Sequence, residues 1–283
     1  MTASDGRQPK KGHAPVIVEF FGPPGAGKTT FARALAVRLR ETGRSVDVHL
    51  SARPGEERST SVFNGETCAR QSLSGPLRRL ARPLAQLIAL RIAGAQPEDS
   101  SIDVLVANLP GGRRFAALRM RQYLVRLSAA WRNAREGEGI TIFDQGYVQA
   151  VSSVLLAMDG PSDTQALAML LAAPRSELAI KIEAPVPDIE ARLRRRERTI
   201  GRVGRLFEAD LGDSSDHAHA ADRLQSGLRR VGRAVLSLNS ADGLPISAEL
   251  ERARREIDQV QMKEEAEFAS YGDGPRRDAI YGR

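Results

Sequence analysis

The stretch Gly22–Thr30, which reads GPPGAGKTT, constrains this 283-residue chain more than any other. It follows the apolar run VIVEFF and precedes a segment with helical periodicity, so it lies where a buried strand turns into a helix. The pattern is a complete Walker A motif. Its glycines let backbone N–H groups surround a phosphate, and the start of the helix adds free donors and partial positive charge. The stretch therefore predicts a site for the phosphates of a nucleotide.

The residues of this loop have separate predicted roles. We expect the whole loop to bind the phosphates of ATP through Gly22, Pro23, Pro24, Gly25, Ala26, Gly27, Lys28, Thr29 and Thr30. Lys28 is expected to neutralise the β and γ oxygens, and the Thr29 hydroxyl to bind Mg²⁺. The variable positions between Gly22 and Gly27 contain no cation. A positive charge on a transferred phosphoryl group must therefore come from another segment.

Five segments have the pattern of buried strands separated by helical stretches. They are Val16–Phe21, Ser45–Leu50, Gly139–Asp144, Glu177–Ala184 and Ala234–Asn239. Right-handed crossovers between such segments give an α/β fold of the P-loop NTPase type, with a five-stranded parallel sheet flanked by helices. The third segment ends at Asp144, and the carboxyl ends of parallel strands share one edge of the sheet. We expect Asp144 to lie beside the Walker loop and to bind Mg²⁺ with Thr29.

Composition bounds the remaining possibilities. Hydrophobic residues make up 41% and charged residues 27%, which permits a packed core, and the formal charge of +7 favours anionic partners. The single cysteine excludes a disulfide within the chain. His217 and His219 are expected in a solvated loop rather than at a metal. The chain has no apolar run of about 18–20 residues and no secretory signal at its N-terminus, so residence in the cytoplasm is expected.

Several further motifs resemble the thymidylate-kinase-like branch of P-loop nucleoside and nucleotide kinases. They follow one another along the chain as ARPGEERST (52–60), FAALRMRQYL (115–124), DQGY (144–147) and RERTIGRVGRLFEADL (196–211). The resemblance implies a kinase that moves the γ-phosphate of ATP to a small-molecule acceptor, with Asp144 on the magnesium side. It also implies a homodimer.

The same resemblance suggests which residues bind the acceptor and which close over it. It carries the acceptor-binding roles onto Arg53, Arg119, Gln122 and Gln145. Gln145 stands where the family has an arginine, and it cannot supply positive charge, so the acceptor need not be thymidylate. An arginine-rich lid at about 194–212 would supply the catalytic cation from Arg198, Arg202 or Arg205. Arg192, Arg195 and Arg196 are expected on a solvated basic face.

These assignments divide the chain into a disordered leader (1–14), a P-loop kinase domain (15–261) and a mobile tail (262–283). The domain would contain an insertion at about 61–112. Within it, the basic amphipathic stretch Pro76–Ile92 is expected to cover the substrate site, although a membrane surface also fits its pattern.

Two functions from different classes remain open at this stage. The first is the small-molecule kinase. The second is a P-loop ATPase that acts as a regulator or assembly factor, with the insertion bound to a protein or a membrane. No nucleic-acid partner is expected, because the chain has no second motif typical of a helicase.

Overall fold

The computed structural model describes residues 14–51, 97–110, 114–199 and 214–270. Their centre is a five-stranded sheet with the order β2-β3-β1-β4-β5, in which all neighbouring strands are parallel. The strands are β1 (Val16–Phe21), β2 (Val46–His49), β3 (Ile140–Phe143), β4 (Leu178–Glu183) and β5 (Val235–Asn239). The five predicted strands and their parallel arrangement are therefore confirmed.

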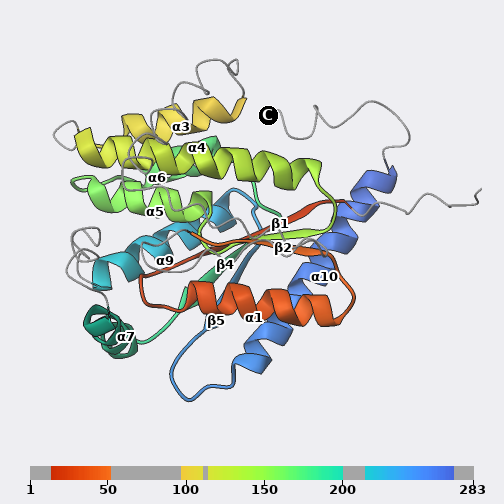
Figure 1. The fold of residues 1–283 in the computed structure, drawn as a ribbon. Helices are drawn as coiled ribbons and strands as arrows, with labels where there is room; N and C mark the ends of the chain where they lie inside the picture. Colours follow the sequence, from red (N-terminus) through yellow and green to blue (C-terminus); the bar gives the residue numbers. More distant parts are fainter. Residues whose placement is uncertain (1–13, 52–96, 111–113, 200–213, 271–283) are drawn as a thin grey trace, which may run out of the picture.

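Helices cover both faces of this sheet (Figure 1). One face carries α1 (Lys28–Glu41) and α10 (Ile246–Ser270), and the other carries α4 (Arg114–Glu136), α5 (Tyr147–Ala157) and α9 (Ser214–Arg230). Further helices are α3 (Pro97–Ala107), α6 (Asp163–Ala172) and α7 (Val186–Thr199). Among the described helices, none combines the length and the apolar character that a membrane crossing requires.

Strand β1 explains why two cores form. All six of its residues are buried, as the continuous apolar pattern of a central parallel strand predicts. Val18 and Phe20 face the cluster that includes α1 and α10, whereas Ile17 and Phe21 face the cluster that includes α4, α5 and α9. Glu19 alternates with them and is completely buried on the α5 side. This carboxylate is the one charged group inside an otherwise apolar strand.

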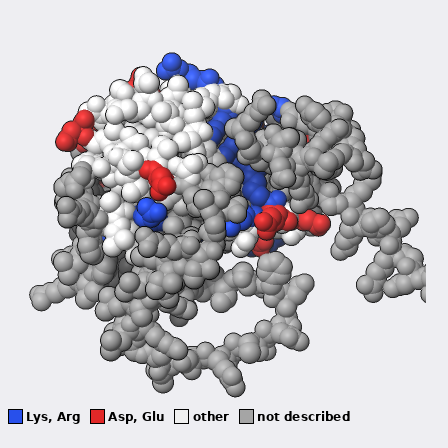
Figure 2. Space-filling view, turned by 90° about the horizontal axis from the view of Figure 1, so that it is seen from above, with Lys and Arg blue, Asp and Glu red and all other residues white. Residues whose placement is uncertain are grey.

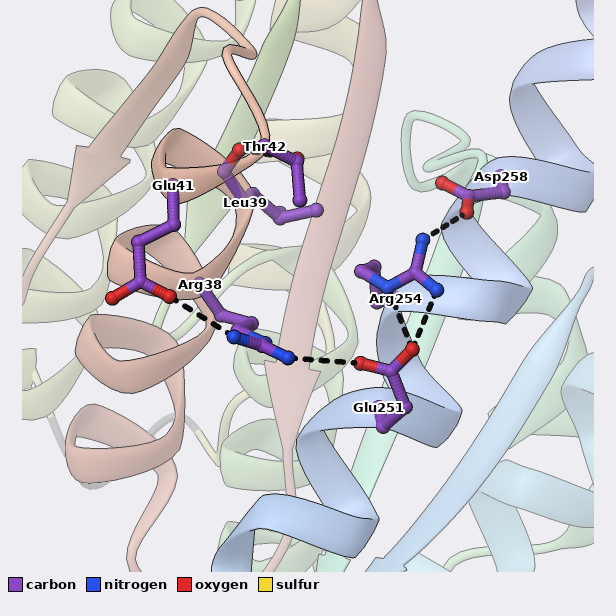
Figure 3. A network of polar contacts seen from close by, with 7 residues as sticks. All are labelled: Arg38, Leu39, Glu41, Thr42, Glu251, Arg254 and Asp258. Atoms are coloured by element: carbon purple, nitrogen blue, oxygen red, sulfur yellow. Dashed lines mark hydrogen bonds and ion pairs between the residues drawn. The ribbon is translucent and has the colours of Figure 1, made fainter.

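A polar network joins the two helices on the α1 face (Figure 3). Arg254 of α10 donates to Glu251 and to Asp258 at 2.5 and 2.8 Å, and Glu251 also faces Arg38 of α1 at 3.8 Å. These side chains are partly exposed, so the network supplements the apolar packing of α10 rather than replacing it.

The structure adds detail to two predictions about segments. The predicted tail begins at residue 262, and its first part, through Ser270, belongs to helix α10, on which Met262 is exposed. His217 and His219 lie on helix α9 rather than in a loop, because the small residues around them permit a helix whose apolar side packs on the core. No metal-binding cluster forms among the residues that the structure describes. The predicted leader and the stretch Pro76–Ile92 lie outside those residues.

A candidate nucleotide-binding site at the carboxyl edge of the sheet

The Walker loop leaves β1 through a turn that requires glycine. Gly22 has a φ of 134°, and a Cβ on it would lie 2.5 Å from the Ile182 carbonyl oxygen of β4. No side chain fits at that distance, so the loop passes directly over the end of the neighbouring strand. The Gly22 N–H donates to Oε1 of Gln149 on α5 at 3.1 Å. The start of the loop is therefore held by two other elements of the fold.

The first turn of α1 lies at the end of this loop. Its N-cap is Gly27, with a φ of 96°, and no side chain caps the helix. The first N–H groups of a helix lack partners inside it, and together with the helix dipole they form a site for an anion. The arrangement fits the predicted role of the loop as a phosphate site.

Lys28 lies folded across its own loop. Its ammonium group is buried and donates to the carbonyl oxygens of Gly22 and Pro23 at 2.7 and 2.8 Å. These bonds hold a positive charge at the mouth of the loop. Burial and the charge of Lys28 lower the pKa of His217 at the start of α9, so this half-buried imidazole faces the same region.

Asp144 lies opposite Thr29, as the strand pattern predicts. The Thr29 hydroxyl donates to Asp144 Oδ2 at 2.7 Å. Ser51, just after β2, donates its backbone N–H to Asp144 Oδ1 at 2.7 Å and its hydroxyl to Oδ2 at 3.2 Å. Three oxygen-bearing side chains thus meet at the carboxyl edge of the sheet, two of them just after β2 and β3 and the third in the first turn of α1.

This donor set suits magnesium. Mg²⁺ prefers oxygen ligands and is held in phosphate sites by one or two protein groups, with the substrate and water supplying the rest. The Thr29 hydroxyl and the Asp144 carboxylate are the residues that would hold it, next to the phosphate site of the loop. Ser51 was not predicted, although its place directly after a strand gave the same signal as that of Asp144.

The segment that carries Asp144 is supported from α4. The Tyr123 hydroxyl donates to the Gln145 carbonyl oxygen at 3.1 Å. Burial, followed by the charges of Asp144 and Glu19, raises the pKa of Tyr123, so its hydroxyl keeps the proton that it donates. Further along α4, Trp131 packs against Phe143 with the two rings tilted by 32° and meets Tyr147 edge to face, at centroid distances of 4.8 and 5.1 Å.

The prediction that Arg192 lies on a solvated face is wrong. Its guanidinium donates to the Ser240 hydroxyl at 3.1 Å, to the Ser240 carbonyl and to Asp242 at 2.6 Å, and it approaches the Gly25 carbonyl at 3.5 Å. The Ser240 hydroxyl in turn donates to the Ala26 carbonyl at 2.6 Å. Helix α7 packs against the loop at Gly25, where an added Cβ would lie 3.1 Å from Leu193 Cγ. Arg192 therefore joins α7, the loop after β5 and the Walker loop.

The remaining predicted residues are placed less completely. Arg119 is exposed on α4, four residues before Tyr123 and on the same side of the helix, and Gln122 and Gln145 are half-buried. Arg198 belongs to the last turn of α7. The other predicted substrate and lid arginines, Arg53, Arg202 and Arg205, lie outside the described residues.

Comparisons with known proteins found similarity at low sequence identity. No known family model matches the chain. A curated relative, the Holliday junction branch migration complex subunit RuvB of Saccharopolyspora erythraea, is 27% identical over 251 residues, and the match covers 83% of this chain and 65% of that protein. Among solved structures, the thymidylate kinase of Ehrlichia chaffeensis aligns over 87% of this chain and 99% of its own, with 13% identity and a TM-score of 0.42.

The assignment of the site rests on the geometry of the chain itself. The strand order, the glycine turn after β1, the uncapped start of α1 and the contact between Thr29 and Asp144 occur together at one edge. The chain has an α/β fold of the P-loop NTPase type, and this fold implies nucleotide binding.

Proposed function

We propose that the chain is an ATP-dependent phosphotransferase that moves the γ-phosphate of ATP to a nucleotide, a nucleoside or a related small molecule. One observation carries the proposal. The Thr29 hydroxyl in the first turn of α1 lies 2.7 Å from the Asp144 carboxylate after β3, and the ammonium group of Lys28, the preceding residue, is bound to the same Walker loop. This set of groups is the one that phosphoryl transfer from a magnesium nucleotide requires on the donor side.

Each group on the donor side has its own role. The N–H groups at the start of α1 and the Lys28 ammonium bind the phosphates, and for this the lysine exchanges its bonds to the loop carbonyls for bonds to phosphate oxygens. Thr29 and Asp144 would hold Mg²⁺, which neutralises charge on the phosphates when bound. Because the loop between Gly22 and Gly27 has no cation, we assign the stabilisation of the transferred group to the predicted lid arginines, Arg198, Arg202 and Arg205.

The acceptor side is supported by helix α4. The early part of this helix lies near the carboxyl edge of the sheet, because Tyr123 contacts Gln145 after β3, whereas Arg135 near its end contacts Glu177 before β4. Tyr123 reaches the backbone next to Asp144, and Arg119 stands one turn nearer that edge. An exposed arginine in this position suits an anionic acceptor, in agreement with the role that the motif resemblance gives to Arg119.

A screen of acceptors tests the proposal. ATP consumption is measured with nucleosides, nucleotides and sugars, against water alone and against the Lys28→Ala variant. The proposal predicts that at least one acceptor accelerates ATP loss and receives the phosphate. If no acceptor raises the rate above that in water, the chain is not a small-molecule kinase.

A pair of arginine variants tests the acceptor side separately. Arg119→Ala is expected to raise KM for the acceptor roughly tenfold or more, since a hydrogen bond to a charged group contributes about 1.5–3 kcal/mol. KM for ATP should change little. Arg121→Ala is the matched control, because Arg121 is exposed on the same helix but faces Asp103 at 3.5 Å. Equal effects of the two variants would remove Arg119 from the acceptor site.

The similarity to RuvB supports a second candidate, a P-loop ATPase that acts on DNA junctions. The face seen from above in Figure 2 carries a band of Lys and Arg side chains, which would favour a polyanion. The same assay separates the candidates when a four-way DNA junction is added as one arm. Stimulation of ATP hydrolysis by the junction, without phosphate transfer to any small molecule, would favour this second function.

A further inference from the structure

The buried carboxylate of Glu19 has no place in the chemistry described so far. It lies in the middle of β1, with no exposed surface. Burial raises its pKa, against the opposing effect of two hydrogen bonds. A carboxylate in an apolar core is unfavourable unless its hydrogen bonds repay the lost hydration. A valine or an isoleucine would fill this position in the core equally well. The glutamate therefore has a role other than packing.

The partners of Glu19 lead to the segment that carries Asp144. Its Oε2 accepts from the backbone N–H of Val148 at 2.9 Å, and its Oε1 accepts from the Ser176 hydroxyl at 2.7 Å. Val148 lies in the first turn of α5, whose N-cap residue, Gly146, has no side chain to cap it. Glu19 thus caps helix α5 from a neighbouring strand, where a negative charge is favoured by the helix dipole.

Space around Gly146 makes this contact close and specific. A Cβ on Gly146 would lie 2.3 Å from Glu19 Oε2 and 2.8 Å from Glu19 Cβ. The backbone between Asp144 and α5 therefore rests directly on the glutamate. In the sheet register, Glu19 also pairs with Phe143, the residue before Asp144. Only two residues separate Asp144 from the helix that Glu19 holds.

We propose that Glu19 is a positioning residue for Asp144: its carboxylate caps α5 from β1 and thereby sets the distance between the Asp144 carboxylate and the Thr29 hydroxyl. The inference rests on the proposed magnesium–nucleotide site. Glu19 lies in β1, and Thr29 follows β1 directly through the Walker loop. A shift of α5 relative to β1 therefore changes the distance between the Asp144 carboxylate and the Thr29 hydroxyl. The bond from Gly22 to Gln149 is a second link between the same two elements.

The variant Glu19→Gln tests this role. The amide keeps the shape but has one acceptor oxygen, so one of the two donors loses its partner. We expect the Mg²⁺ concentration that half-saturates binding of the non-hydrolysable analogue AMP-PNP to rise about tenfold, the usual effect of losing a group that orients a metal ligand. Binding of AMP-PNP in EDTA should stay within about twofold of wild type, because the phosphate loop is unchanged. Calorimetry measures both constants.

Glu177→Gln is the matched control. Glu177 is also a buried glutamate, and it accepts from the Ile17 N–H at 2.7 Å and from Arg135 at 2.6 Å, at the other end of β1. Glu177 has the same side chain as Glu19, but these hydrogen bonds join it to β1 and α4 rather than to α5. The Mg²⁺ requirement of Glu177→Gln should therefore equal that of wild type. The proposal is overturned if both variants raise the requirement equally, or if Glu19→Gln leaves it unchanged.

Two further measurements keep the test decisive. Trp131 is the single tryptophan and contacts Phe143 and Tyr147 on either side of Asp144. Its emission should therefore change in Glu19→Gln and not in Glu177→Gln. If Glu19→Gln does not fold, Ser176→Ala removes one partner of Glu19 and should raise the Mg²⁺ requirement in the same direction. An unchanged requirement in Ser176→Ala would then refute the proposal.

The outcome is separable from that of the acceptor screen. Wild-type protein that binds Mg²⁺ and AMP-PNP through Lys28, but phosphorylates no acceptor, would refute the kinase function and leave the role of Glu19 standing. Wild-type protein that binds no magnesium nucleotide would refute both.

Discussion

Replacing Gly146 with alanine is expected to destabilise the fold severely through one contact. Gly146 has φ −112° and ψ −154°, an extended conformation that any residue adopts, so the effect comes from space and not from backbone strain. An added Cβ would lie 2.3 Å from Glu19 Oε2. Carbon and oxygen need about 1 Å more than this to be in ordinary contact. The backbone at Gly146 and the carboxylate must therefore separate by that amount.

Such a separation would break the cap of α5. The bond from Val148 to Glu19 is 2.9 Å long, and about 1 Å of added distance takes it beyond hydrogen-bonding range. Loss of a hydrogen bond to a charged group contributes about 1.5–3 kcal/mol, and overpacking adds about 1–3 kcal/mol. We expect Gly146→Ala to lower the free energy of unfolding by about 2.5–6 kcal/mol, the sum of these two terms, which for a domain of this size lowers Tm by roughly 5–24 °C.

Urea denaturation of Gly146→Ala, followed by Trp131 emission, measures this loss. Gly227→Ala is the matched control, because among the described residues its Cβ would meet Leu170 Cδ1 alone, at 2.9 Å, which is the end of a flexible side chain. Gly227 lies within α9, where alanine is favoured over glycine by about 1 kcal/mol, so the control should be near neutral. If Gly146→Ala unfolds within about 1 kcal/mol of wild type, the backbone does not rest on Glu19 and the steric argument fails.

Three further predictions concern groups outside this contact. Because burial and Lys28 lower the pKa of His217 in the folded state, the unfolded state binds more protons between that lowered pKa and 6.5. Stability should therefore fall as pH drops through this window, and His217→Asn should flatten the fall in Tm. Arg192→Ala should lower Tm more than Asp242→Asn, because Arg192→Ala also removes the bonds to Ser240; equal shifts would mean that the ion pair with Asp242 alone matters. Arg254→Ala should lower Tm in dilute buffer and much less in 1 M NaCl, because the network of Arg254 is partly exposed and therefore screened; a difference that is independent of salt would contradict this.

The strands and the Walker loop were predictable because local patterns determine them. Val16–Phe21 is a continuous apolar run apart from Glu19, and it forms a strand with the predicted bounds. Asp144 was predicted from the rule that parallel strands end at one edge, and its carboxylate lies 2.7 Å from the Thr29 hydroxyl. Ser51 obeys the same rule, since it follows the end of β2 as Asp144 follows β3, and the same rule applied to every strand would have found it.

Arg192 and Glu19 show where such patterns fail and why. Arg192 differs from its neighbours in α7 because it binds the loop after β5, about fifty residues further along the chain. The periodicity of the helix does not show which segment packs against it. Glu19 gave a local signal, a charge within an apolar strand, but its meaning depends on Val148 and Ser176, more than a hundred residues away. A charged residue in the central strand of a parallel sheet is unfavourable for folding alone. Glu19 is the register partner of Phe143, the residue before Asp144, and this position indicates that the core of this fold also sets the geometry of the site.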